Sequence, residues 1–305
     1  MTPDSLLAAP LPCTPEPLLD AITTFLKHHH LPADTVREAL RAEITAAGPQ
    51  ALATLRDRLA SAGSEWGYFP ADPVARQVHR LLAARLLPHL MRLEGAERLR
   101  GLDTARMVIV SNHLSYSDAN IVEVLLHRAN ADAIAERLTV VAGPKVYSNI
   151  TRRFSSLCFG TIKTPQSSGV SSGEAVMNAR EVASAARRTI VVAQERLRAG
   201  DALLVFAEGT RSRTGGMQTL LAGVTRYFEE PGTIVLPVGI AGSESLFPIG
   251  EQRLTPSEIV MAIGRPINAD ELRAASGGDR RVMMDEIGRA IAAVLPQDYR
   301  GEYAT

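Results

Sequence analysis

The chain has 305 residues, of which 46% are hydrophobic, so it is long enough for one large domain or two unequal domains with a buried core. Its 33 Lys and Arg residues balance its 33 Asp and Glu residues, and this zero net charge argues against nucleic acid as a partner. The two cysteines, Cys13 and Cys158, are too few for a disulfide framework or a four-thiolate zinc site.

The first 85 residues carry helical signals and no strand signal. Apolar side chains recur at helical spacing from position 18 to position 26, and Asp34 is a suitable N-cap for the helix that follows. Further helices are expected over residues 35–47, 50–62 and 73–87. We therefore predict a small helical N-terminal domain over residues 1–72. The three consecutive histidines at 28–30 are expected to end a helix rather than to bind a metal, and no metal or cofactor is predicted.

After Pro88 the pattern changes, because short apolar runs now alternate with helical stretches. Strands are expected over residues 107–111, 138–142, 159–163, 202–207, 233–240 and 258–263. Helices are expected over residues 118–129, 145–157, 173–199, 217–229 and 280–295. This alternation predicts an α/β domain over residues 73–305, with a largely parallel mixed sheet flanked by helices. The polar stretch 164–173 is expected to be a loop, and whether it closes over a substrate stays open.

No apolar run reaches the ~18–20 residues that a membrane-spanning helix needs. The N-terminus also lacks the basic region of a secretory signal. We therefore expect a cytoplasmic protein, with peripheral contact to the inner face of a membrane left open.

The segment after the first predicted strand of this domain has the sequence S-N-H-L-S-Y-S-D and ends at Asp118. Ligand sites in open α/β sheets lie at the carboxyl ends of strands, so the segment is well placed for chemistry. His113 and Asp118 are either a general base with the carboxylate that orients it, or a loop histidine bonded to a helix-capping Asp. No nucleophile elbow accompanies the pair, and a base without a protein nucleophile favours deprotonation of a substrate hydroxyl.

A second polar segment, E-G-T-R-S-R-T-G-G, follows the predicted strand at 202–207. Its two guanidinium groups, on Arg211 and Arg213, have the geometry that suits a phosphate. Its glycines let the backbone approach a ligand closely. Glu208 is expected to hold an arginine in place or to order the turn, and a charged surface loop is the alternative for the whole segment.

Together, N-H-x4-D and the later F-x-E-G-T-R-S resemble the glycerolipid acyltransferase family, which includes glycerol-3-phosphate and lysophosphatidate acyltransferases. The resemblance covers roughly residues 90–265. It implies that His113 is the general base and that Asp118 orients it. It implies phosphate contacts from the second segment, through Gly209, Thr210, Arg211 and Arg213. It implies supporting roles for Asn112, Glu208 and Ser212.

The middle motif departs from the family pattern. Many members have a G-x-x-x-[IV]-D-R segment whose Arg binds phosphate, whereas this chain has F-G-T-I-K-T-P-Q, with Lys163 in place of that Arg. A lysine here, a V-A-G segment before Lys145 and a helical N-terminal domain resemble the soluble plastid type of glycerol-3-phosphate acyltransferase. Lys145 is a further phosphate candidate, with a solvated lysine at a helix start as the alternative.

We therefore predict transfer of a fatty acyl group from a thioester to the hydroxyl of glycerol-3-phosphate, without an acyl-enzyme. Acyl-carrier protein and acyl-CoA both remain open as the donor. Glycerol-3-phosphate is preferred because it is water-soluble and suits a sequence without a spanning helix. The alternatives are lysophosphatidate (1-acylglycerol-3-phosphate) as a lipid-borne acceptor, and a non-catalytic module that binds lipid or carrier protein.

Overall fold

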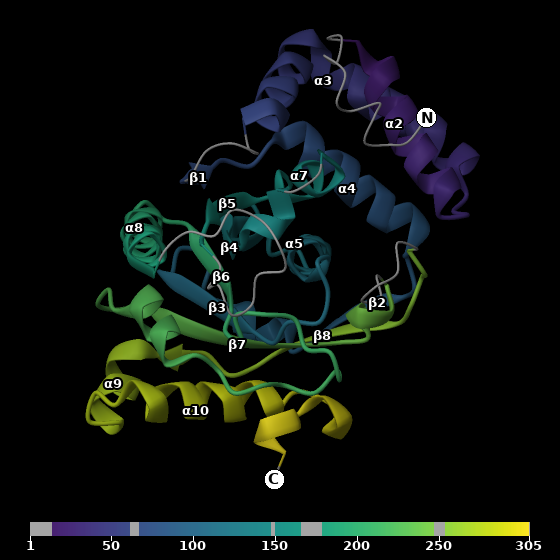
Figure 1. Ribbon diagram of the computed structural model, residues 1–305. Helices are drawn as coiled ribbons and strands as arrows, with labels where there is room; N and C mark the ends of the chain where they lie inside the picture. The colour runs from purple at the N-terminus through teal and green to yellow at the C-terminus, as the bar shows by residue number, and fades with distance from the viewer. Residues whose placement is uncertain (1–13, 62–66, 148–149, 166–178, 247–253, 305) are drawn as a thin grey trace.

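The computed structural model describes residues 14–61, 67–147, 150–165, 179–246 and 254–304 (Figure 1). Its N-terminal part consists of helices α2 (Pro15–His28), α3 (Ala33–Ser61) and α4 (Pro73–Leu86). The expected helix break is confirmed at Gly48, whose φ of 80° interrupts α3 just before Pro49. The histidines end α2 as expected. None of the helices in the described residues is long and apolar enough to cross a membrane.

A mixed, mostly parallel sheet forms the centre of the molecule, as predicted. Within the described residues it contains β1 (Tyr68–Phe69), β2 (Met91–Glu94), β3 (Met107–Ser111), β4 (Leu138–Ala142), β5 (Gly160–Lys163), β6 (Ala202–Phe206), β7 (Ile234–Ala241), β8 (Ile259–Ile263) and β9 (Ile267–Asn268). The strand order is β1-β5-β4-β6-β3-β7-β8-β2, with β9 paired to β7. The strands from β5 to β7 in this order run parallel, whereas β8 and β9 are antiparallel to β7.

Helices cover both faces of the sheet (Figure 1). They are α5 (Asp118–Arg128), α6 (Asp132–Ala135), α7 (Ile150–Ser156), α8 (Ala179–Arg198), α9 (Ala269–Ala275) and α10 (Arg280–Ala292). Short 3-10 turns connect the elements, namely η1 (Ala96–Leu99), η2 (Pro144–Tyr147), η3 (Ala222–Phe228), η4 (Ser243–Ser245), η5 (Gln297–Tyr299) and η6 (Gly301–Tyr303). One face of the sheet packs against α4 and α5, with α2 and α3 in the same apolar cluster, and the other face packs against α8 and α10.

Three expectations about secondary structure are corrected. A strand does occur before residue 85, because Tyr68 and Phe69 pair with the open edge of β5. The stretch 217–229 is not one helix: it is irregular up to Leu221 and then forms η3. The Leu221 N–H donates to the Ala207 carbonyl and the Met217 carbonyl accepts from the Glu302 N–H, so the first intrahelical hydrogen bond of such a helix is not formed. The helix expected over 145–157 is divided between η2 and α7.

Two other expectations fall partly outside the described residues. The helix expected over 173–199 is confirmed as α8 from residue 179 onward. Of the loop expected over 164–173, only the first two residues are described.

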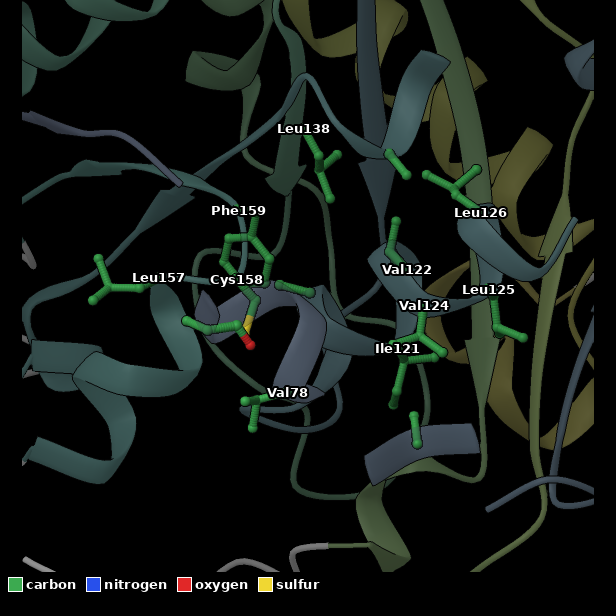
Figure 2. Packing of buried hydrophobic residues seen from close by; sticks show 14 of the residues in the cluster. Val78, Ile121, Val122, Val124, Leu125, Leu126, Leu138, Leu157, Cys158 and Phe159 are labelled. Carbon is green, nitrogen blue, oxygen red and sulfur yellow. The ribbon is translucent and has the colours of Figure 1, made fainter. Parts of the chain in front are cut away.

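The main apolar core lies between the sheet and the helices on its α5 face (Figure 2). Val78 of α4, Ile121 and Leu125 of α5, Leu138 of β4 and Phe159 before β5 belong to one buried cluster. Residues of α2 and α3 belong to the same cluster, so the core is continuous from the N-terminal helices to the sheet. Because this packing fixes α5 against β3, it also fixes the segment that connects them.

A buried ion pair lies within this layer. The Arg80 guanidinium donates to Glu123 Oε1 at 2.8 Å through Nε, and its Nη2 lies 2.6 Å from the same oxygen. Both side chains are buried, and burial raises the pKa of Glu123 above its ordinary value although Arg80 opposes the shift. Arg76 lies 3.7 Å away, but its guanidinium donates to the carbonyls of Cys158 and Glu136.

We expect Arg80→Met to lower the free energy of unfolding by about 3–5 kcal/mol, because it leaves the buried Glu123 without its main partner. The double variant Arg80→Met/Glu123→Leu should recover most of this loss, since it removes both charges. Urea unfolding followed by circular dichroism measures both. A loss under about 1 kcal/mol in the single variant would show that the pair behaves like a surface salt bridge.

Candidate active site

The site begins where β3 and β6 end side by side. Ser111 at the end of β3 pairs with Phe206 at the end of β6, so the two polar segments leave the sheet next to each other. Asn112 is fully buried and exchanges two hydrogen bonds of 2.8 Å with the backbone of Ile240 in β7. Its side chain therefore holds β3 and β7 in a fixed register at this edge of the sheet.

His113 and Asp118 form the predicted pair. His113 Nδ1 lies 2.8 Å from Asp118 Oδ2, and the same oxygen accepts hydrogen bonds from the N–H groups of Leu114 at 2.7 Å and Ser115 at 2.9 Å. Asp118 is fully buried at the start of α5, where the helix dipole favours a negative charge. The carboxylate thus closes the loop into a tight turn and orients the imidazole, but it does not cap α5, because the N–H groups from which it accepts precede the helix.

Both the ring and the backbone of His113 are fixed by neighbouring groups, and one ring nitrogen remains available. Its ring stacks on Phe206, with centroids 4.2 Å apart and an interplanar angle of 18°. The backbone of His113 is bonded at both ends, through its N–H to Glu208 Oε1 at 2.8 Å and through its carbonyl to the Ser212 N–H at 2.7 Å. The side chain is 17% exposed, and Nε2 has no protein partner in the part of the chain that the structure describes. Nε2 is therefore the atom free to exchange a proton.

Glu208 orders the turn. Its second oxygen accepts from the backbone and side-chain N–H groups of Gln218, at 2.9 and 3.2 Å, so the carboxylate joins three segments of chain. Among the described residues no arginine forms an ion pair with it, and the expectation that Glu208 holds an arginine is therefore wrong. Burial raises the pKa of Glu208, against the opposing effect of the N–H groups that it accepts from.

The remainder of the second segment is a turn with a defined shape. The Ser212 hydroxyl donates to the Gly216 carbonyl at 2.7 Å and closes the loop. Gly209 has a φ of 72°, in the left-handed region that favours glycine. Thr210 is half-buried, and Arg213 is exposed to solvent. Ser212 and Glu208 thus hold the backbone of this turn and of the neighbouring His113 segment.

The guanidinium of Arg211 lies over an aromatic ring of the His113–Asp118 turn. Its guanidinium carbon lies 3.8 Å from the ring centroid of Tyr116, which belongs to that turn. Arg152 of α7 lies over the same ring at 4.5 Å and donates to the Lys145 carbonyl at 3.3 Å. Two guanidinium groups from distant segments therefore meet at Tyr116, beside the catalytic candidates.

Lys163 lies at the same end of the parallel strands, further from His113. It ends β5, and three strand spacings of ~4.8 Å separate β5 from β3. The side chain is buried, its Nζ lies 5.0 Å from the ring centroid of Tyr147, and burial together with Arg153 lowers the pKa of the ammonium group. Lys145 is half-buried in η2.

Sequence reasoning missed three residues that the fold brings here. Arg152 and Ser243 lie far from both motifs in the chain, and Tyr116 lies inside the first motif without a recognised role. A basic residue on the predicted helix at 145–157 was the only sequence signal for Arg152. Among the described residues no group of three or more His, Cys, Asp or Glu side chains suited to a metal ion is found.

Comparison with known proteins places this site in a family. Residues 91–241 match the family model described as Acyltransferase, and the match contains both polar segments. This match supports the resemblance of the two motifs to the glycerolipid acyltransferase family.

Among solved structures the chain is similar to the 1-acyl-sn-glycerophosphate (LPA) acyltransferase PlsC from Thermotoga maritima. The identity is 18%, the TM-score is 0.47, and the alignment covers 81% of this chain and 80% of that chain. No curated protein matches this chain.

Proposed function

We propose that the chain transfers a fatty acyl group from an acyl thioester to the hydroxyl of glycerol-3-phosphate. The observation that carries this proposal is the His113 Nδ1–Asp118 contact of 2.8 Å, which leaves Nε2 free in the turn whose Tyr116 ring lies against the guanidinium of Arg211. A base next to a phosphate-binding cation suits an acceptor that has a hydroxyl and a phosphate on one small molecule.

In the proposed reaction, Nε2 of His113 takes the proton of the acceptor hydroxyl as its oxygen attacks the thioester carbonyl. Asp118 keeps the imidazole in the tautomer with Nδ1 protonated and stabilises the imidazolium that forms. The tetrahedral adduct then collapses, the carbon–sulfur bond breaks, and the imidazolium returns the proton to the leaving thiolate. The base supplies about 10²–10⁴ of the rate, and positioning of the two substrates supplies much of the remainder. No acyl-enzyme forms.

We assign the acceptor's phosphate to the cations around Tyr116. Arg211 of the second polar segment and Arg152 of α7 bring two guanidinium groups to the Tyr116 ring. Lys163 adds a third cation at the same end of the strands. A phosphate dianion is bound best by such forked donors in a partly buried setting. Arg213 is exposed, so in this proposal it contributes only long-range electrostatic attraction to the acceptor's phosphate.

The test is release of free thiol from a long-chain acyl thioester, offered both as acyl-CoA and as acyl-carrier protein. We expect release that depends on glycerol-3-phosphate and that the variant His113→Gln abolishes. Release only with lysophosphatidate would keep the mechanism and assign the enzyme to the second acylation of glycerol. A folded wild-type protein that releases thiol with neither acceptor would contradict the proposal and favour a non-catalytic binding module. A radiolabelled acyl group retained on the denatured protein would contradict direct transfer.

A further inference from the structure

Asp118 has a second partner that lies outside both motifs. Its Oδ2 accepts from His113, Leu114 and Ser115, whereas its Oδ1 accepts from the Ser243 hydroxyl at 2.6 Å. Both side chains are fully buried, so neither has water as a substitute partner. Ser243 is the only residue in the described chain that donates to Oδ1.

The fold delivers Ser243 to this position through β7. Asn112, next to His113, is bonded in both directions to Ile240, which holds β7 beside the catalytic turn. The chain then turns at Gly242, whose φ is 85° and where a side chain would collide with the Glu258 carbonyl. Ser243 follows at once as the first residue of η4. This turn places the Ser243 hydroxyl within hydrogen-bond distance of Asp118.

A tyrosine from the C-terminal segment locks the same turn. The Tyr299 hydroxyl accepts from the Gly242 N–H at 3.2 Å and donates to Glu244 Oε1 at 2.6 Å, so it holds the residues on both sides of Ser243. The carbonyl of Tyr299 accepts from the Met217 N–H in the loop that follows Glu208. Tyr299 therefore connects the serine turn to the second polar segment.

We propose that Ser243 is a positioning residue for the reaction, the third member of a Ser243–Asp118–His113 chain, and that Tyr299 fixes it in place. This inference rests on the proposed role of His113 as the base. With Oδ1 held by Ser243, the carboxylate cannot rotate about its Cβ–Cγ bond, so Oδ2 stays aligned with Nδ1 of His113. Without that hydrogen bond, the Leu114 and Ser115 N–H groups still hold Oδ2, but the buried Oδ1 loses its donor, so the carboxylate is less firmly aligned with the imidazole while the acceptor site around Tyr116 is unchanged.

The kinetic test compares Ser243→Ala with Ser243→Thr and with the matched control Ser257→Ala. Ser257 donates to the Gly242 carbonyl in the same turn and does not touch Asp118. We expect Ser243→Ala to lower kcat by about 10- to 100-fold, as for loss of a hydrogen bond to a charged group, with an unchanged KM for the acceptor. Ser243→Thr, which keeps the hydroxyl, should recover most of kcat, and Tyr299→Phe should lower kcat to a smaller extent.

A second readout does not depend on turnover. In ¹⁵N-histidine-labelled protein, the Nδ1 proton of His113 should give a downfield resonance, assigned by its absence in His113→Gln. Ser243→Ala should shift or broaden this resonance, and Ser257→Ala should leave it in place. An unchanged resonance or an unchanged kcat in Ser243→Ala would overturn the positioning role while leaving the proposed function intact. A wild-type protein without turnover but with a resonance that responds to Ser243 would instead overturn the proposed function alone.

Discussion

The variant His113→Gln is expected to lower kcat by at least about 10²–10⁴-fold with little change in stability, because it removes the proposed base from a partly exposed position. Gln keeps a similar volume against the Phe206 ring, so the turn itself should persist. Thiol release at saturating acceptor measures the effect, and thermal unfolding checks the fold. Retention of about a tenth of the wild-type activity would contradict the assignment of the base.

The chain offers a matched control for this experiment. His127 lies on α5 with Nδ1 2.6 Å from Asp132 Oδ1, the same chemical pair five residues apart, but it is at the other end of the helix from Asp118. His127→Gln should therefore leave kcat unchanged. A loss of activity as large as that of His113→Gln would show that both histidine–aspartate contacts affect activity through the stability of the protein rather than through chemistry.

The variant Arg211→Met is expected to raise the KM for glycerol-3-phosphate by about 10- to 100-fold, as for loss of a hydrogen bond to a charged group. Met keeps an apolar stem over the Tyr116 ring and removes only the guanidinium. The KM for the acyl thioester should not change, because the proposed contact is with the acceptor's phosphate. Inorganic phosphate should compete with the acceptor in the wild-type enzyme and much less in the variant.

Arg213→Met is the matched control, since Arg213 belongs to the same loop and is exposed. We expect a smaller rise in KM, one that disappears at high salt, because an exposed charge acts only through screened attraction. A larger effect from Arg213 than from Arg211 would reverse the assignment of the phosphate ligand within this segment. Arg211→Lys distinguishes charge from geometry, because a lysine restores the charge without the fork.

Local patterns predicted those parts of the fold that local physics controls. The runs at 107–111 and 202–207 are continuous and apolar, as buried parallel strands are, and they were placed within one residue of β3 and β6. The glycine and proline at 48–49 marked a helix break because their backbone preferences act without help from the rest of the chain. The two-residue strand β1 has no such pattern, since it exists only because β5 offers an open edge.

The same division applies to the site. Residues close together in the chain, such as His113 with Asp118, were paired correctly because a loop that enters a helix brings them together by itself. The stretch 217–229 was expected to be helical because its composition allows a helix, whereas the Met217 carbonyl and the Leu221 N–H, which would form its first helical bond, are bonded to Glu302 and Ala207 instead. Propensity is a weak preference, and tertiary hydrogen bonds override it.

The sequence alone indicated the class of chemistry: the residue types, their order and their places after two strands led to a resemblance that the match of residues 91–241 to the Acyltransferase family model supports. Only the tertiary structure decided which further groups meet at that edge of the sheet. Arg152 reaches Tyr116 because α7 packs on the same side of the sheet as the catalytic turn. Ser243 reaches Asp118 because β7 lies next to β3, a pairing between segments more than a hundred residues apart in the chain. Such contacts depend on strand order, which follows from the packing of the whole core and is not encoded in any short segment.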